Sequence, residues 1–376
     1  MDFSLSSDQR LLKDSLERFV REDYDFATRR AASATDEGFD RATWARFAEL
    51  GWLAATLPED FSGLGGGAAE AMVLMEGLGR GLAVEPFVPS VVLGGGLIAL
   101  GGSADHKSEL LPALAEGRLL LAFAYAEPTS RFDLHDVTVS ARRDGDGVVI
   151  DGAKCVVMAG GSADKVIVSA RTSGERRDTG GISLFLVDRG VEGLSVRDYP
   201  TVDGLRAAEL GFENVRVPAD ALLGEWDAGL PLIERVVDRA TAAICAEALG
   251  IMAVLNEATL EYSKTRVQFE QPIGKFQALQ HRMVDMFIAY EETKSLVYLA
   301  AIKADDADPV ERAKAVSAAK VQVGEAGRLI GQEAVQIHGA IAMTDEYYVG
   351  HYFKRLSMID RQFGDTDHHL KRFGAL

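Results

Sequence analysis

The chain has 376 residues, of which 47% are hydrophobic and 26% are charged, and its formal net charge is −17. This length allows two or three domains, and the composition is ordinary for a soluble globular protein. Nucleic-acid binders gain affinity by neutralising phosphates with Lys and Arg, so an acidic excess of this size argues against a nucleic-acid partner.

The apolar runs are broken by Gly or by charge, and we therefore expect no membrane span. The N-terminal stretch MDFSLSSDQRLLKDSLERF is charged and amphipathic, which does not suit a secretory signal. The two cysteines, Cys155 and Cys245, are too few for a disulfide framework and favour a reducing compartment. The sequence thus predicts a cytoplasmic protein.

The first third of the chain has a helical period. Ser6 and Gln9 have the spacing of a capping box, and Leu12, Leu16 and Phe19 follow on one helix face. Further helical patterns cover residues 41–55, 68–80 and 106–116, with a Gly-rich break at residues 63–67. These patterns predict an N-terminal α-helical domain over residues 1–118.

The period changes twice after this domain. Short runs rich in Val, Ile and Phe, separated by turn signals such as residues 144–147, predict a central antiparallel β-barrel or sandwich domain over residues 119–228. After Gly229 the helical period returns in long stretches, which predict a C-terminal four-helix-bundle domain over residues 229–376. The expected fold class is therefore α+β, in the order helical, β, helical.

Short motifs occur in a fixed order along this chain. They are Leu57-Pro58-Glu59, Glu127-Pro128, Gly204-Leu205-Arg206, Arg266-x-x-Phe269 with Gln277, and Gln336-Ile337-His338-Gly339. As an ordered set the motifs resemble the acyl-CoA dehydrogenase family over essentially the full length. The resemblance implies the cofactor FAD, an acyl-CoA substrate, a role in fatty acid or lipid metabolism, and an electron-transfer flavoprotein as acceptor. In that chemistry a carboxylate takes the α proton while flavin N5 accepts the β hydride.

The resemblance assigns a set of residues to the FAD of a neighbouring subunit. Arg266 carries a planar, permanent cation that suits a pyrophosphate, and Gly339 allows close backbone approach. Phe269 would pack on the cofactor, while the amides of Gln277 and Gln336 would serve its adenosine half. The alternative is that Arg266 forms a salt bridge and Phe269 belongs to the core.

The family's catalytic carboxylate has no counterpart at the matching positions. Phe363 stands where the family places its Glu, immediately before Gly364. Some members carry the base on the long helix of the C-terminal domain, and that position falls at Ala240. Asp238, Glu247 and Asp365 remain as displaced candidates for a base.

The segments that hold the flavin ring in the family are also altered. Ala126 and Phe132 replace a Thr and a Ser, Val156 replaces an aromatic residue, and Met158 replaces a Thr. Each lost hydroxyl removes a hydrogen bond worth on the order of 1 kcal/mol. We expect the chain's own flavin site to be weakened.

The closing segment, residues 351–369, is similar to the small subunit of pimeloyl-CoA-type dehydrogenases, which form α2β2 heteromers. We therefore expect this chain to complete the FAD site of a catalytic partner subunit, without a catalytic Glu of its own. A self-sufficient homo-oligomeric enzyme with a displaced base and a cofactor-free scaffold remain the alternatives. His368 and His369 are expected to be structural, with no metal.

Overall fold

The computed structural model describes residues 5–376 and divides the chain into two compact units. The first unit comprises the residues up to Ala31, Ala68–Ala83 and Thr241–Leu376. The second comprises Ala32–Gly67 and Val84–Ala240. The boundary near residue 240 falls within one continuous helix, α7 (Leu230–Thr265).

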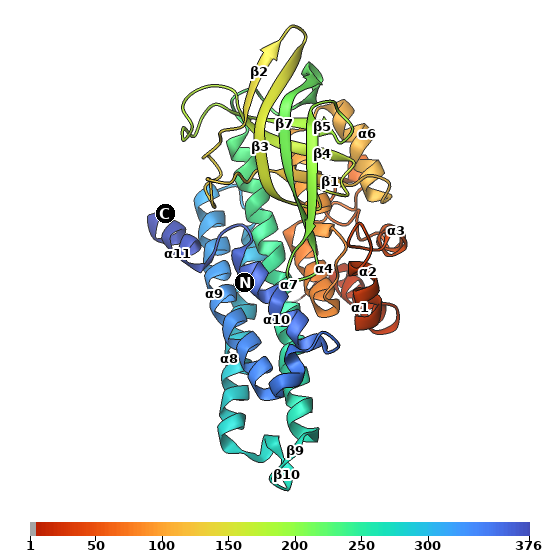
Figure 1. Ribbon diagram of the computed structural model, residues 1–376, viewed down its shortest axis with the longest axis vertical. Helices are drawn as coiled ribbons and strands as arrows, with labels where there is room; N and C mark the ends of the chain where they lie inside the picture. Colours follow the sequence, from red (N-terminus) through yellow and green to blue (C-terminus); the bar gives the residue numbers. More distant parts are fainter. Residues whose placement is uncertain (1–4) are drawn as a thin grey trace. The chain divides into compact units, whose positions relative to one another are not determined.

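The first unit is helical, as the sequence predicts for both ends of the chain (Figure 1). Its capping box is confirmed, because the Gln9 amide donates to Ser6 Oγ at 3.2 Å and the Ser6 amide donates to Gln9 Oε1 at 3.0 Å. The helix α9 packs against its neighbours α8, α10 and α11. The helices of this unit are α1 (Ser7–Glu22), α4 (Ala68–Gly81), part of α7, α8 (Gln277–Lys303), α9 (Pro309–His338), α10 (Tyr348–Arg361) and α11 (Thr366–Ala375). Helix α2 (Phe26–Ser33) begins in this unit and ends in the second.

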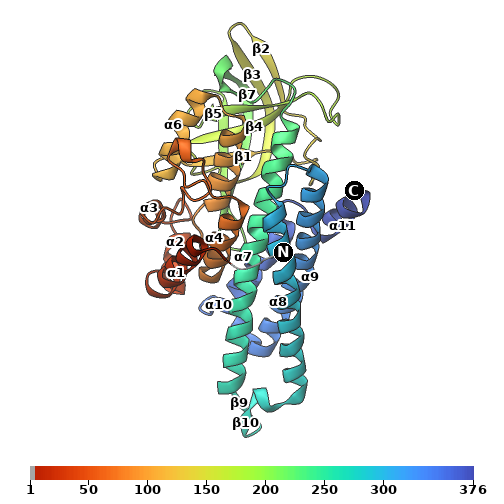
Figure 2. The same ribbon diagram turned by 180° about the vertical axis from the view of Figure 1, so that it is seen from behind.

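A small hairpin of β9 (Val267–Gln268) and β10 (Gln271–Pro272) joins α7 to α8 at the end of this unit (Figures 1 and 2). The chain reverses direction there, so α7 and α8 run antiparallel. The hairpin therefore brings the residues that end α7 next to those that begin α8.

The second unit contains the sheet. Its order is β6-β7-β3-β2-β4-β5-β8, and β1 pairs with β4. Most pairs are antiparallel, while β1 with β4 and a single residue pair of β2 with β4 are parallel. The α+β fold class is thus confirmed. The strands are β1 (Leu121–Ala124), β2 (Ser140–Asp144), β3 (Gly147–Met158), β4 (Lys165–Arg171), β5 (Ile182–Asp188), β6 (Leu194–Pro200), β7 (Arg206–Pro218) and β8 (Leu222–Leu223).

Helical segments of the second unit include one that the sequence did not reveal. A π-helix over Val88–Gly95 continues into α5 (Gly96–Gly101), and nearly all of its side chains are buried. Val and Gly are poor helix formers, and a helix without a polar face has no amphipathic signal. The other helices here are α3 (Arg41–Glu49) and α6 (Ala104–Ala115).

The 36-residue helix α7 corrects the expectation that no segment is apolar and long enough to cross a bilayer. By length and composition α7 passes that test, because its most apolar window holds no more than two charged residues. However, 72% of its most apolar window is buried inside the protein. Such burial is typical of the core helix of a globular fold.

Within the first unit, α4 and α7 approach so closely that only glycine fits at the contact. A Cβ on Gly79 would lie 2.2 Å from the carbonyl oxygen of Glu247, and a Cβ on Gly250 would lie 2.0 Å from that of Glu76. Neither main-chain oxygen can move without shifting a helix. The backbone contact therefore fixes how α4 lies on α7.

We predict that Gly250→Ala destabilises the chain by about 1–3 kcal/mol through overpacking, although Ala is otherwise the better helix former by about 1 kcal/mol. Urea denaturation measures the effect. Gly374→Ala on α11 is the matched control, because its Cβ would meet nothing within 4 Å. A stabilised Gly250→Ala variant would show that the two helices are not in this close contact.

Candidate functional site

Three of the residues assigned to FAD lie together at the hairpin end of the first unit. Arg266 follows α7, Phe269 lies in the turn of the hairpin, and Gln277 begins α8, and all three are exposed. Phe269 is 85% exposed, and its ring meets the edge of Phe276, with the ring centroids 6.1 Å apart. The alternative that Phe269 belongs to this chain's core is therefore wrong. Arg266 makes no ion pair with any residue in the range 5–376, so its guanidinium remains available to an anion.

The other two assigned residues, Gln336 and Gly339, are exposed at the C-terminal end of α9. The ring of His338 stacks on Tyr262 of α7, with the centroids 4.4 Å apart. Since Tyr262 lies one helical turn before Arg266, the two segments share one end of the unit.

Gly339 has a φ of 71°, and a Cβ there would meet nothing within 4 Å. An open glycine with positive φ, at the same end of the unit as the unpaired Arg266, suits the close approach of a dinucleotide. The residues present at this end fit the pyrophosphate and adenosine half of FAD.

The segments that replace the family's ring-binding motifs also come together, in the second unit. The amide of Cys155 donates to the carbonyl oxygen of Ala126 at 2.9 Å. A β-bulge between Lys154 and Val157 interrupts the pairing of β3 with β7. At the bulge Val156 has a φ of 51° and is 51% exposed. Positive φ is rare for a β-branched residue, and bulges often re-aim side chains at functional sites.

A buried ion pair holds these two segments in place. Lys154 Nζ donates to Glu127 Oε1 at 2.8 Å, to Ser169 Oγ at 3.0 Å and to the carbonyl oxygen of Tyr125 at 3.1 Å. Burial alone would raise the pKa of Glu127, but the Lys154 ammonium and several hydrogen bonds outweigh it and keep that pKa below its ordinary value. The scaffold of the ring-binding site is therefore rigid.

The side chains on that scaffold fit a flavin ring poorly. The matching positions 126, 132, 156 and 158 carry no hydroxyl. The hydroxyl of Ser130 is used by the main chain of Glu127, and that of Ser162 by Ala159. The donors that would recognise the edge of the ring are therefore missing or committed.

Phe363, which the sequence analysis assigns to the position of the family's base, stands in a tightly held turn between α10 and α11. Its φ is 58° and its side chain is 8% exposed. The buried Lys320 of α9 donates to the carbonyl oxygens of Asp360 at 3.1 Å and Gly364 at 2.5 Å. Burial lowers the pKa of Lys320. An ammonium held by main-chain oxygens at the end of a helix fixes where that helix stops.

A buried imidazole holds the same turn from the other side. His369 Nε2 donates to the carbonyl oxygen of Phe363 at 3.0 Å, and Nδ1 lies 3.2 Å from Ser317 Oγ. This arrangement assigns the proton to Nε2 and leaves Nδ1 to accept from the hydroxyl. The structural role expected for His369 is consistent with these contacts.

The three carboxylates considered as displaced bases are each either hydrogen-bonded within the fold or buried. Glu247 forms a bidentate, buried ion pair with Arg355, at 2.5 Å from Nε to Oε1 and 2.7 Å from Nη2 to Oε2. Asp365 caps α11 by accepting from the amide of His368 at 2.9 Å. In the second unit, Asp238 is 1% exposed and Ala240 is fully buried.

Three residues that organise these sites were missed from the sequence: Lys154, Lys320 and Arg355. The available signal was a Lys inside an apolar stretch, as in GAKCVV and SAAKVQV. A Lys or Arg in such a position must find a partner or lie at a surface. The partner of Arg355 could not be predicted from the sequence, because Glu247 lies 108 residues away along the chain.

We predict that Arg355→Met destabilises the chain by about 3–5 kcal/mol, because it leaves the Glu247 carboxylate buried and unpaired. The double variant Glu247→Leu/Arg355→Met should recover most of this loss in a chemical denaturation series. Equal destabilisation by the single and double variants would show that the pair does not act as a unit.

A second prediction concerns pH. Burial, with the nearby Lys320 ammonium, lowers the pKa of His369 to about 3, while His368 and Arg372 also disfavour its protonation. The imidazole of His369 therefore takes up a proton near pH 6.5 in the unfolded chain, whereas it stays neutral in the folded chain. Because of this difference, the free energy of unfolding must fall as the pH drops below 6.5, by up to about 1.4 kcal/mol per pH unit.

His369→Gln should reduce this dependence between pH 7 and about 5.5, in urea midpoints compared with the wild type. The exposed His281 provides the control, and His281→Gln should leave the pH slope unchanged. An unaltered slope in His369→Gln would contradict the assignment of a neutral, buried imidazole.

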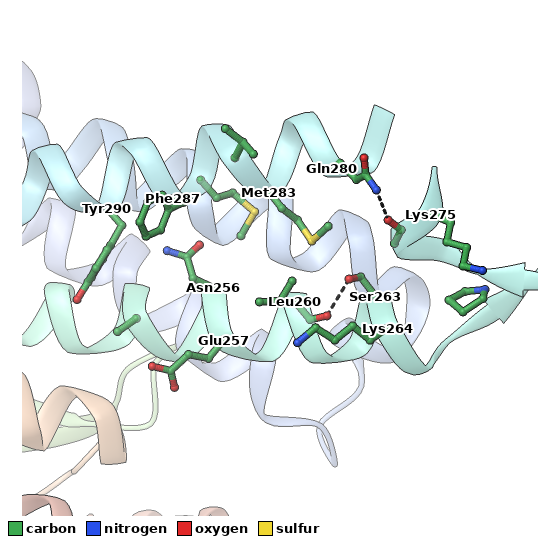
Figure 3. Close-up of a pocket in the computed structure, with 15 residues that line it drawn as sticks. Asn256, Glu257, Leu260, Ser263, Lys264, Lys275, Gln280, Met283, Phe287 and Tyr290 are labelled. Carbon is green, nitrogen blue, oxygen red and sulfur yellow. Dashed lines mark hydrogen bonds between the residues drawn. The ribbon is translucent and has the colours of Figure 1, made fainter. Parts of the chain in front are cut away.

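The first unit also has a cavity of about 770 Å³ between α7 and α8 (Figure 3). Its floor is apolar and includes Leu260, Met283 and Phe287, and Asn256 points into the space between the helices. Gln280 closes one end by donating to the carbonyl oxygen of Gly274 at 2.8 Å. We call this feature the α7–α8 groove.

Comparison with known proteins defines the class. Models of the N-terminal, middle and C-terminal domains of acyl-CoA dehydrogenase match residues 6–118, 122–215 and 227–373. The chain is 33% identical over 311 residues to acyl-CoA dehydrogenase FadE12 of Mycobacterium tuberculosis, covering 81% of this chain and 80% of that protein.

Two solved structures extend the likeness to the whole chain. The ChsE4–ChsE5 complex from Mycobacterium tuberculosis has a TM-score of 0.91 at 26% identity, and the FAD complex of PigA has a TM-score of 0.92 at 25% identity. Each alignment covers 100% of this chain and 98% of the matched chain. The chain belongs to the acyl-CoA dehydrogenase family, whose members are FAD-dependent oxidoreductases that act on the CH–CH bond of an acyl-CoA.

Proposed function

We propose that this chain is one subunit of a heteromeric acyl-CoA dehydrogenase and completes the FAD site of a partner subunit that carries the catalytic carboxylate. One contrast supports the proposal. The residues suited to a neighbour's FAD are exposed and uncommitted, while positions 363 and 240, which match the family's base, carry no carboxylate.

In this proposal the work is divided between the chains. Bound FAD would supply the acceptor for the hydride of the β carbon, and the partner's carboxylate would take the α proton. Arg266 of this chain holds the pyrophosphate through its planar fork of donors, and Phe269 covers the cofactor. Gln277, Gln336 and Gly339 contact the adenosine half.

A heteromer is in keeping with the family. The name of the ChsE4–ChsE5 complex gives two different chains, and this chain is similar to it over its full length. By analogy we propose an α2β2 assembly in the cytoplasm, with an electron-transfer flavoprotein as acceptor. Buried pairs such as Glu247 with Arg355 then serve to hold the fold rather than to move protons.

The proposal predicts that the chain purified alone holds little FAD and has little activity with an artificial acceptor. Co-expression with a family member that has Glu at the position matching Phe363 or Ala240 should restore both flavin and turnover. In that complex Arg266→Ala should lower FAD affinity by about tenfold or more, because it removes a charge-assisted contact. Arg21→Ala, at an exposed arginine of α1, is the control and should have no effect.

Full flavin occupancy and turnover by the isolated chain would contradict the proposal. In that case Asp365→Asn, Asp238→Asn and Glu247→Gln, measured with the same acceptor, would identify a displaced base. A complex without flavin and without turnover would favour a cofactor-free scaffold.

A further inference from the structure

His338 is a buried ring at the end of the helix that carries Gln336. It is the last residue of α9, and 4% of it is exposed to solvent. The residues on either side of it, Gln336 and Gly339, are exposed and are proposed to contact the adenosine half of FAD. The imidazole itself is out of reach of that cofactor, so any role toward FAD must act through the main chain.

The hydrogen bonds of His338 assign its tautomer. Nδ1 lies 2.8 Å from the carbonyl oxygen of Ala334, and a carbonyl oxygen can only accept, so Nδ1 carries the proton and donates. Nε2 therefore holds a lone pair. This atom is buried and makes no hydrogen bond with any residue in the range 5–376. Burial lowers the pKa of His338 from its ordinary value, although the bond to Ala334 opposes this effect.

Two tyrosine rings contact the imidazole. Tyr262 of α7 stacks on it, with the centroids 4.4 Å apart and the planes at 30°. Tyr347, which precedes α10, lies with its centroid 5.5 Å away and its plane at 49°. Aromatic pairs at such separations stabilise a fold beyond the area that they bury. The ring of His338 therefore joins the end of α9 to the end of α7 and to the start of α10.

The titratable groups that face His338 are these two phenols. Burial and the neighbouring Tyr348 raise the pKa of Tyr347 to about 12. The group that faces the ring from α9 is the carbonyl of Ala334, and among the described residues no carboxylate lies near enough to favour a protonated imidazole. A proton on Nε2 would therefore place a charge and a donor where neither water nor an acceptor meets them, which is costly.

The ring is coupled to the main chain of the segment proposed to meet FAD. The amide of Gly339 donates to the carbonyl oxygen of Val335, which closes the last turn of α9. Gly339 then takes a φ of 71°, and a short 3-10 helix, Gly339–Met343, follows. A protonated His338 reaches water only by leaving Tyr262, and that movement opens the last turn. Gln336 and Gly339 then lose their fixed positions.

We infer that His338 is a positioning residue for the partner's FAD: its neutral ring, stacked on Tyr262, holds the end of α9 in the form that receives the adenosine half, and protonation releases that form. The identity of the ligand rests on the proposed function. The released ring takes up a proton at its ordinary pKa of 6.5, whereas the stacked ring resists protonation to lower pH. FAD affinity must therefore fall as the pH drops below 6.5, by at most about tenfold per pH unit.

The test measures FAD affinity of the co-purified complex by fluorescence titration between about pH 7.5 and 5. The wild type should bind FAD about tenfold more weakly at the lower pH. His338→Phe keeps a ring for Tyr262 but takes up no proton, so it should bind as the wild type does at the higher pH and lose the acid decline. His338→Ala should bind about tenfold more weakly at both. Turnover per bound flavin should not change, because His338 touches no reacting atom.

The control is His106→Gln in the second unit. His106 forms a capping box with Ser103, and Gln can make the same bonds at that position. This variant should keep the acid decline of the wild type. Melting curves check that each variant is folded. Variants of His338 that melt earlier but keep the wild-type pH profile of FAD affinity would show a merely structural role and overturn the inference.

The isolated chain gives a readout that needs no FAD. Hydrogen-exchange protection factors of residues 335–343 should fall between about pH 7.5 and 5 in the wild type and stay level in His338→Phe. A fall of equal size in both chains would show that the imidazole does not control the end of α9, and would overturn the inference.

The outcomes separate this inference from the proposed function. If the complex holds FAD and turns over, but its affinity for FAD is the same at both pH values, the inference fails and the proposed function stands. Tighter binding at the lower pH that requires His338 would make the imidazolium a direct contact of a phosphate, and would overturn the positioning role. If the protection of residues 335–343 responds to pH through His338 while the complex holds no FAD, the proposed function fails and the coupling of His338 to the end of α9 stands.

Discussion

The cost of burying an unpaired charge governs the parts of this chain on which its function depends. Lys154 and Glu127 join the two segments of the altered ring-binding site, Glu247 and Arg355 lie between α7 and α10, and Lys320 fixes the turn that carries Phe363. Each of these groups would be strongly destabilising without its partner. Once paired, each fixes the backbone of the segment that carries it.

This arrangement explains why the chain keeps a precise scaffold around positions that have lost their reactive groups. The turn at Phe363 is held by an ammonium and an imidazole, although a phenyl ring cannot accept a proton. The bulge keeps a positive φ at Val156, although positions 126, 132, 156 and 158 carry no hydroxyl. Under the proposed function, the wall of a shared site needs this backbone but not the base. At the other end of the first unit, Arg266 and Gly339 are exposed and uncommitted, as contacts to another chain require.

The sequence predicted those features that depend on local rules. The capping box at Ser6 and the change of period from helical to β and back follow from neighbouring residues alone. Residues 88–101 were missed because a buried helix of Val and Gly has neither propensity nor amphipathic pattern. The partners of Lys320 and Arg355 could not be predicted, because the carbonyl oxygens and the carboxylate that satisfy them come from distant segments.

The central claim is that two unlike chains share one flavin, and counting the flavin tests it most directly. The ratio of FAD absorbance to each chain's concentration in the purified complex gives the stoichiometry. We expect one FAD for each pair of unlike chains, bound about tenfold or more weakly when Arg266 of this chain is replaced by Ala. One FAD for every chain, retained in the isolated subunit, would contradict the claim.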